Sequence, residues 1–358
     1  AALLGVPAIV LDTNNDLARL GDLWPRPPEG WTEEDTAKAA EYGQRVDVTV
    51  WTPGRNSGRP MSLALLPDFA GLIGDEDERD QAIEMARATL APFIGARGAS
   101  AQLKEGVLAD ALRAFAKEGG GDLDRLIETL SDLPDEVSEI DGAAKLAAGM
   151  ANLLRAAIAT NPLLQSRGTA LDPALLFGND SGKTRISVIN FSGLASDEAR
   201  QSFVNQLQMS LFTWIKRNPS STGRLIVLDE AQNFAPSMKM TPCKESTLAL
   251  AAQARKYGLG MIFATQTPTG IDNKIVSNCT THFYGRMSSP AAIAATRGLL
   301  EAKGGVGGED VARLSRGEFY FSTEAVARPL RIRTPICLTW HPANPLTANE
   351  VVERARRR

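Results

Sequence analysis

The chain is poor in cysteine, in aromatic side chains and in long apolar runs. Its 358 residues include three cysteines without a C-x-x-C pair, which excludes a zinc knuckle and a disulfide framework and fits a reducing compartment. No run approaches the roughly 18 apolar residues of a membrane-spanning helix, so we expect a cytoplasmic protein with no membrane contact. The 39 Lys and Arg nearly balance the 42 Asp and Glu, so any contact with nucleic acid needs a local basic patch.

Short apolar runs bounded by Gly, Pro and Asn alternate with longer stretches of helical periodicity. This alternation is typical of an α/β fold, a mostly parallel sheet flanked by helices. Continuously apolar runs such as LIVLD and MIFAT favour strands buried on both faces. The candidate strands are residues 7–12, 46–51, 185–191, 224–229, 260–265, 282–286 and 318–322.

A helical insertion is expected in the middle of the chain. From about Asp75 to Asn161 four amphipathic stretches follow one another, several started by Asp or Ser and ended by Gly or Pro. We therefore divide the chain into a first core part (1–74), a helical insertion (75–165), a second core part (166–340) and a C-terminal tail (341–358). The insertion either covers the sheet or docks a partner.

Two adjacent acids end the most informative strand, RLIVLDEAQNFAP. Asp229 and Glu230 fall at its carboxyl end, and ligands bind at that edge in open α/β sheets. Asp229 suits the water shell of a magnesium ion, and Glu230 suits a water molecule that attacks a γ-phosphate. The alternative is an acidic turn without a function.

An amide lies at the tip of the next strand. Residues 246–257 are expected to form a helix, and the strand after it ends in Thr265 and Gln266. Gln266 offers both a donor and an acceptor, so it can sense a γ-phosphate or orient a water molecule. The alternative is a turn residue whose hydrogen bonds are satisfied locally.

These motifs, in this order and spacing, resemble the HerA/FtsK superfamily of hexameric P-loop ATPases, most closely its HerA-like branch. The resemblance rests on LIVLDEAQNFAP as a Walker B strand, ARKYGLGMIFATQTP as an arginine helix with a glutamine strand, and NKIVSNCTTHFYGRM as the next helix and strand. VPAIVLDTNNDL also resembles the strand after the P-loop helix. The resemblance implies a RecA-like core in a hexameric ring, with ATP and Mg²⁺ between subunits and DNA moved through the pore.

The resemblance also implies roles for single residues. Asp229 matches the aspartate associated with Mg²⁺ through water, Glu230 the catalytic glutamate and Gln266 the sensor glutamine, so these three also contact the nucleotide. Arg255 lies where related motors carry an arginine proposed to reach the neighbour's γ-phosphate, and Arg286 is a second candidate for that role. Either arginine can instead form a salt bridge at a subunit interface.

The phosphate loop of this superfamily, G-x-x-x-x-G-K-[ST], is absent from the sequence. The nearest string, Gly178 to Thr184, has three residues between its glycines, and it precedes a strand instead of opening a helix. We interpret it as a polar loop. The opening AALLGVPAIVLD is typical of a helix end and the following strand, so we expect the true loop upstream of Ala1. The alternative is a degenerate subunit without hydrolysis.

DNA contacts are expected from loop lysines, among which Lys239, Lys244 and Lys274 are candidates. Aromatic side chains for stacking single strands are absent there, which favours duplex DNA. The leading hypothesis is an ATP-driven DNA translocase or helicase of HerA type with a nuclease or other effector partner. The alternative is a nucleotide-dependent hexameric scaffold for an effector in an antiviral defence complex. A third hypothesis is a motor for export of protein or conjugative DNA, against which the lack of a membrane-spanning run counts.

Overall fold

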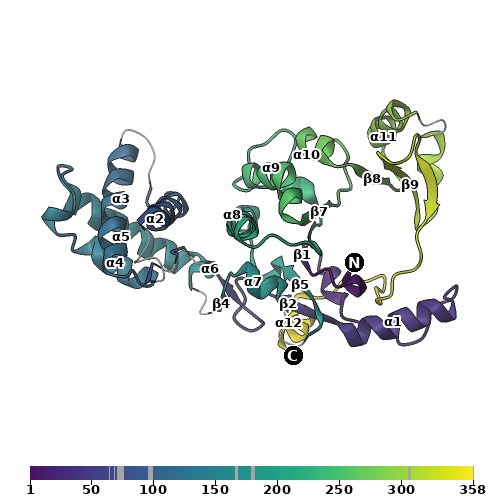
Figure 1. Ribbon diagram of the computed structural model, residues 1–358, viewed down its shortest axis with the longest axis horizontal. Coiled ribbons are helices and arrows are strands. Elements are labelled where there is room, and N and C mark those ends of the chain that lie inside the picture. The colour runs from purple at the N-terminus through teal and green to yellow at the C-terminus, as the bar shows by residue number, and fades with distance from the viewer. Residues whose placement is uncertain are drawn as a thin grey trace. The chain divides into compact units, whose positions relative to one another are not determined.

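The computed structural model describes residues 1–63, 65–67, 69–70, 76–95, 100–165, 168–178, 182–304 and 308–357. The chain divides into two compact units, one formed by Ala1–Pro60 with Asp172–Arg358 and the other by Met61–Leu171 (Figure 1). The division expected between residues 74 and 75 lies outside the described residues, and so does residue 166, the expected start of the second core part.

A five-stranded parallel sheet forms the centre of the first unit, as the sequence predicted. Its strand order is β2-β5-β1-β6-β7, and all four neighbouring pairs are parallel. The central strand β1 is buried over its whole length, because a strand between two neighbours and two helical layers has no face in water. The strands are β1 (Ala8–Asp12), β2 (Val46–Trp51), β5 (Thr184–Asn190), β6 (Arg224–Leu228) and β7 (Leu259–Phe263).

Helices connect and flank the strands of this sheet. They are α1 (Glu33–Arg45), α7 (Pro173–Phe177), α8 (Asp197–Arg217), α9 (Lys244–Gln253), α10 (Asn273–Asn278) and α12 (Ala348–Arg356). The helix expected over residues 246–257 ends at Gln253, and a 3₁₀ turn follows it over Ala254–Tyr257.

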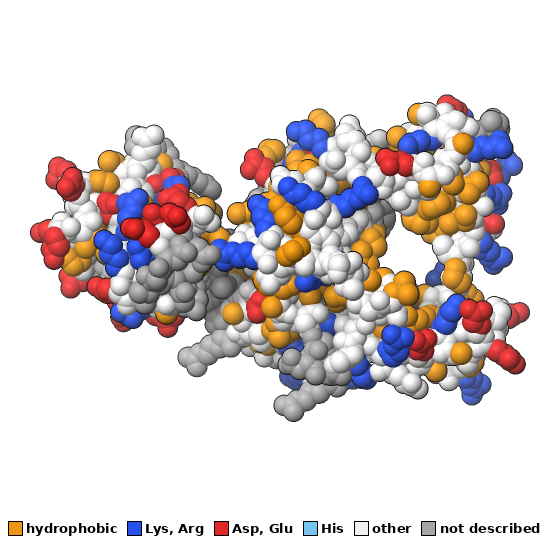
Figure 2. All heavy atoms as spheres, in the orientation of Figure 1, with side chains coloured by type: hydrophobic (Ala, Val, Ile, Leu, Met, Phe, Trp, Pro, Cys, Tyr) orange, Lys and Arg blue, Asp and Glu red, His pale blue; other side chains and the backbone are white. Residues whose placement is uncertain are grey.

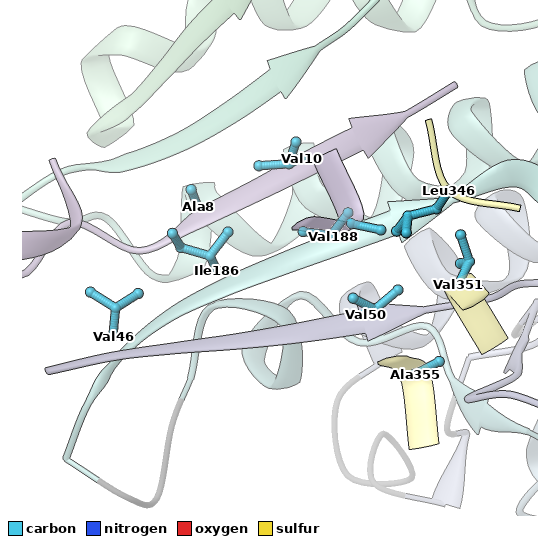
Figure 3. Packing of buried hydrophobic residues seen from close by; sticks show 10 residues of the cluster. Ala8, Val10, Val46, Val50, Ile186, Val188, Leu346, Val351 and Ala355 are labelled. Atoms are coloured by element: carbon cyan, nitrogen blue, oxygen red, sulfur yellow. The ribbon is translucent and has the colours of Figure 1, made fainter. Parts of the chain in front are cut away.

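The C-terminal segment packs against the sheet. Helix α12 begins at a capping box, in which Thr347 and Glu350 satisfy each other's backbone N–H groups. Figure 3 shows Leu346 near Val188 of β5, and Val351 and Ala355 near Val50 of β2, and all five are buried in one apolar cluster. Burial of this surface fixes the C-terminal segment to the strands that carry the site.

Two candidate strands belong to a separate antiparallel sheet, so they do not extend the parallel one. This sheet has the order β10-β9-β8, with β8 (Thr281–Tyr284), β9 (Glu318–Thr323) and β10 (Leu330–Arg333), and α11 (Pro290–Ala302) lies between β8 and β9 in the chain. The ring of Phe283 lies 5.1 Å from that of Phe321. Phe283 and Leu330 are exposed, and Figure 2 shows hydrophobic side chains on the surface around this sheet.

The second unit is helical, as expected. Its helices are α2 (Glu76–Leu90), α3 (Ala101–Lys117), α4 (Leu123–Ser131), α5 (Ala143–Thr160) and the short α6 (Pro162–Gln165). Strands β3 (Met61–Ser62) and β4 (Thr169–Ala170) pair with each other and bring the two ends of the unit together. Within the described parts of the chain, no helix is long and apolar enough to cross a membrane.

Candidate functional site

The carboxyl ends of three neighbouring strands bring polar side chains together. Leu11 of β1 pairs with Leu228 of β6, and Leu228 pairs with Phe263 of β7. Because the three strands are parallel and in this register, the residues that follow them leave the sheet at one edge. Gln266 after β7 thus contacts Glu230 after β6, next to Asp229 in the chain, and the sequence predicted that these residues follow adjacent strands.

Glu230 accepts hydrogen bonds from three side-chain amides. Gln266 Nε2 donates to its Oε1, Gln232 Nε2 donates to its Oε2 over 2.5 Å, and Asn14 Nδ2 donates to Oε1 over 3.4 Å. Thr265 Oγ1 donates to Oε1 of Gln232 over 2.6 Å, which leaves the Gln232 amide nitrogen turned toward Glu230. The carboxylate is therefore held in one orientation by neutral groups.

The backbone of Glu230 is in the left-handed region. Its φ is 51°, and Asn15, with a φ of 66°, is the other non-glycine residue with positive φ among the described residues. Such a conformation costs about 1 kcal/mol or more for a residue with a Cβ atom and gathers at functional sites. Both residues follow strands that end at the same edge of the sheet. Ala231 N–H donates to the carbonyl of Ala264 over 2.8 Å, which fixes the turn to the end of β7.

Asp229 lies half-buried among other carboxylates. Burial raises the pKa of its carboxyl, and the charges of Glu230 and Asp12 raise it further, while a hydrogen bond from Thr13 lowers it. Thr13 Oγ1 and Asn14 Nδ2 donate to its Oδ2 over 3.3 and 3.4 Å. Close carboxylates disfavour each other's charged form, so a cation or its water shell at this edge would be stabilised.

No direct metal cage is present in the described part of the chain, where no group of three or more His, Cys, Asp or Glu residues is placed to hold a metal ion. Magnesium commonly keeps several of its waters and uses only one or two protein carboxylates. The donor set around Asp229 therefore fits contact with Mg²⁺ through water, the mode expected from the sequence.

The structure does not bring the two arginines to these acids. Arg255 lies in the 3₁₀ turn Ala254–Tyr257, and Arg286 lies two residues beyond β8; both side chains are exposed. Among the described residues, no hydrogen bond or salt bridge joins either arginine to Asp229 or Glu230. Arg286 and Arg316 line a cleft of about 220 Å³ beside the antiparallel sheet. A role at the nucleotide of the same chain is therefore not supported for either arginine.

Comparisons with known proteins show which families and folds this chain is similar to. Residues 184–290 match the family described as zonular occludens toxin (Zot). The chain is 29% identical to the DNA double-strand break repair helicase HerA of Sulfurisphaera tokodaii over 113 residues. This matched segment covers 30% of this chain and 23% of that protein. The bacterial conjugative coupling protein TrwB matches 96% of this chain and 88% of its own at 11% identity, with a TM-score of 0.50. In sequence over these segments, and in fold, the chain is similar to P-loop ATPases of the HerA/FtsK type.

The comparisons differ in how much of each chain they cover. The chain spans about a quarter of the length of the curated HerA that it matches, and the likeness to TrwB shows the fold. The genome packaging NTPase B204 of Sulfolobus turreted icosahedral virus 2 matches 42% of this chain and 68% of its own at 17% identity, with a TM-score of 0.32. The segment 184–290, which matches the Zot family, includes the two acids, Gln266 and both arginines.

Lys244 is not a DNA-contacting loop lysine, and that expectation was wrong. Its side chain is only 8% exposed and pairs with Asp272 at 2.9 Å. Its Nζ also donates to the carbonyl oxygen of Pro236 over 2.7 Å. Burial forces an ammonium group to satisfy its donors within the protein, so Lys244 stabilises the loop after Walker B. Lys239 and Lys274 are exposed and stay candidates.

Replacing Lys244 by methionine is expected to lower the free energy of unfolding by about 3 kcal/mol, since Asp272 then lacks its cation. The hydrogen bond from Lys244 is the main cause that holds the pKa of Asp272 below its usual value. A lowered pKa stabilises the fold above the unfolded value of about 3.9, and this stabilisation is lost as the pH falls through the folded value.

Urea denaturation at pH 7 and near pH 3 checks this prediction, with exposed Lys239→Met as the control. The difference between wild type and Lys244→Met should shrink at the lower pH, while Lys239→Met should stay within about 0.5 kcal/mol of wild type. Equal stabilities of the two variants at pH 7 would contradict the structural role of Lys244.

The segment from Gly178 to Thr184, which is the nearest match to a phosphate loop, lies partly outside the described residues, which omit Asn179, Asp180 and Ser181. Its described ends agree with a connection between two elements, since α7 ends at Phe177 and β5 begins at Thr184. No helix opens at Lys183, so the backbone there does not have the strand–loop–helix order of a phosphate loop.

The sequence reasoning missed Thr13 and Asn14, which follow β1 and contact both acids. The signal was present, because the polar run DTNND directly follows the continuously apolar AIVL. The rule that pointed to Asp229, a polar residue after a buried strand, applies equally to this run.

Proposed function

We propose that this chain is the core of an ATP-driven DNA translocase or helicase of HerA type, acting in the cytoplasm. The proposed assembly is a hexameric ring that hydrolyses ATP at its subunit boundaries and works with a nuclease or other effector. The observation that carries the proposal is the contact of Gln266 with Glu230 beside Asp229, at one edge of a parallel sheet. The names of the matched HerA, a repair helicase, and of TrwB, solved with ADP and Mg²⁺, support it.

Each residue of the site has a distinct task in this proposal. Asp229 would hold Mg²⁺ through water, and the ion, when bound, neutralises charge on the β- and γ-phosphates. Glu230 accepts the hydrogen bonds of three amides and has a carboxylate suited to polarise the attacking water. Gln266 donates a hydrogen bond to Glu230 and would sense the γ-phosphate through its remaining polar atoms.

The exposed arginines suit a contact with a neighbouring subunit. A guanidinium is always charged and planar, so it fits the charge that develops during phosphoryl transfer. Arg255 or Arg286 would complete the site of the next subunit, which couples hydrolysis to ring formation. The exposed Lys239 and Lys274 would contact the phosphate backbone of duplex DNA without reading its sequence.

A nucleotide-dependent scaffold is the second candidate, in which the ring organises an effector in an antiviral defence complex with little movement along DNA. The separate compactness of the helical unit Met61–Leu171 favours it, because such a unit offers a docking surface without disturbing the sheet.

Displacement of a triplex-forming strand from duplex DNA separates the two candidates. The full-length protein with ATP and Mg²⁺ is expected to displace the third strand, and the rate should fall to background with ADP. Turnover of ATP and binding to DNA without strand displacement would favour the scaffold. Absence of ATP turnover under all conditions would refute the translocase, and absence of nucleotide binding as well would refute both.

A further inference from the structure

The turn after β1 supplies neutral donors to both acids of the site. Thr13 Oγ1 lies 3.3 Å from Asp229 Oδ2, and Asn14 Nδ2 lies 3.4 Å from both Asp229 Oδ2 and Glu230 Oε1. Asn14 thus bridges two adjacent carboxylates that would otherwise repel each other. Because its amide and the Thr13 hydroxyl carry no charge, they orient the acids without cancelling the negative field that favours a cation.

Buried polar contacts fix this turn from two sides. Asp12 is fully buried, and its Oδ2 accepts hydrogen bonds from Ala18 N–H over 3.1 Å and from Asn190 Nδ2 over 2.9 Å. Asn190 Nδ2 also donates to Asn15 Oδ1 over 2.8 Å, while Asn15 Nδ2 donates to the carbonyl oxygen of Leu346 over 3.0 Å. Strand β5 and the C-terminal segment therefore hold the left-handed Asn15 directly beside Asn14.

This arrangement lowers the free energy of unfolding. Asp12 Oδ1 is buried without a hydrogen-bond partner among the described residues, and burial raises the pKa of this carboxyl. An unsatisfied buried oxygen costs about 1–3 kcal/mol, and the left-handed Asn15 adds to that. Such costs persist where a site needs the geometry they impose.

We infer that the Thr13–Asn14 turn after β1 is a third segment of the site, beside the segments after β6 and β7. In it the Thr13 hydroxyl and the Asn14 amide position Asp229 and Glu230. The inference rests on the proposed function, since it gives Thr13 and Asn14 a task only if the two acids act in ATP hydrolysis. Thr13 and Asn14 are positioning residues, because their contacts are to the acids.

Thr13 allows a matched pair of variants that separates the hydroxyl from the side-chain shape. Thr13→Val keeps the shape and removes the donor, whereas Thr13→Ser keeps the donor and removes a methyl group. In the full-length protein, Thr13→Val and Asn14→Ala are each expected to lower kcat for ATP about tenfold, as for the loss of one hydrogen bond to a charged group. The KM for ATP should stay within about twofold, and Thr13→Ser should retain most of the turnover.

Asn218→Ala is the control, since Asn218 is also exposed and its side chain donates one hydrogen bond, to the carbonyl oxygen of Trp214. It should match wild type in turnover. Thermal unfolding of every variant shows whether the fold is kept, which is expected because Asn14 is exposed and Thr13 only partly buried.

A double-mutant cycle with Glu230→Gln keeps this inference distinct from the proposed function. If Glu230→Gln abolishes turnover while Thr13→Val and Asn14→Ala behave as wild type, the inference is wrong and the proposed function stands. If Glu230→Gln turns over ATP normally, the proposed function itself fails. Equal losses in Thr13→Val and Thr13→Ser would show that packing, and not the hydroxyl, matters. In the Glu230→Gln background, Asn14→Ala should have little further effect, because Asn14 donates a hydrogen bond to Glu230.

Discussion

Glu230→Gln is expected to lower ATP turnover at least 100-fold while nucleotide binding persists. The substitution removes the carboxylate that would polarise the attacking water, a contribution of about 10² to 10⁴ in rate for a positioned base. It also places an amide nitrogen where donors converge from Gln266, Gln232 and Asn14. The variant therefore loses both the base and its fixed orientation.

Steady-state turnover and binding of a fluorescent ATP analogue, measured in the full-length protein, check this prediction. Glu245→Gln is the matched control, because Glu245 is an exposed carboxylate in the first turn of α9 and should leave turnover unchanged. Hydrolysis by Glu230→Gln at the wild-type rate would refute the role assigned to Glu230.

Arg255→Ala is expected to lower turnover about 1,000-fold, the scale of an arginine that stabilises the transition state of phosphoryl transfer. Because Arg255 is exposed and makes no described contact with Asp229 or Glu230 of its own chain, its proposed target is the nucleotide of a neighbour. Mixing Arg255→Ala subunits with Glu230→Gln subunits should restore part of the activity, since some boundaries then combine an intact Glu230 with an intact Arg255.

The same mixing experiment with Arg286→Ala decides between the two arginines. Restoration by mixing for one variant and near-normal turnover for the other assigns the trans role. A loss of activity that mixing does not restore would place the arginine at its own subunit's site. Normal turnover in both variants would leave both arginines with the interface salt-bridge role.

The parallel sheet and the placement of Glu230 and Gln266 at one edge of it were predictable from the sequence. Continuous apolar runs mark strands buried on both faces, and polar residues that follow neighbouring parallel strands must share an edge. The four helices of the insertion were predictable for the same kind of reason, because amphipathic periodicity and end signals are local.

Three features were not predictable in this way. Lys244 is charged and lies after a loop, which favours exposure. In the structure it is buried, because its ammonium group pairs with Asp272 and donates to the Pro236 carbonyl oxygen. Strands β8 and β9 have apolar runs like those of the main sheet, and only their partners make them antiparallel. Thr13 and Asn14 belong to the site only because they contact acids that lie more than 200 residues away in the chain.

The amino-acid sequence by itself determined the strand and helix types, the parallel core and the identity of the acids, because those properties depend on neighbours a few residues apart. The tertiary structure alone decided which polar groups touch the acids, which lysine is buried and which strands form a second sheet. Those outcomes depend on long-range pairing, and the free energy of pairing distant groups is not encoded in any local pattern.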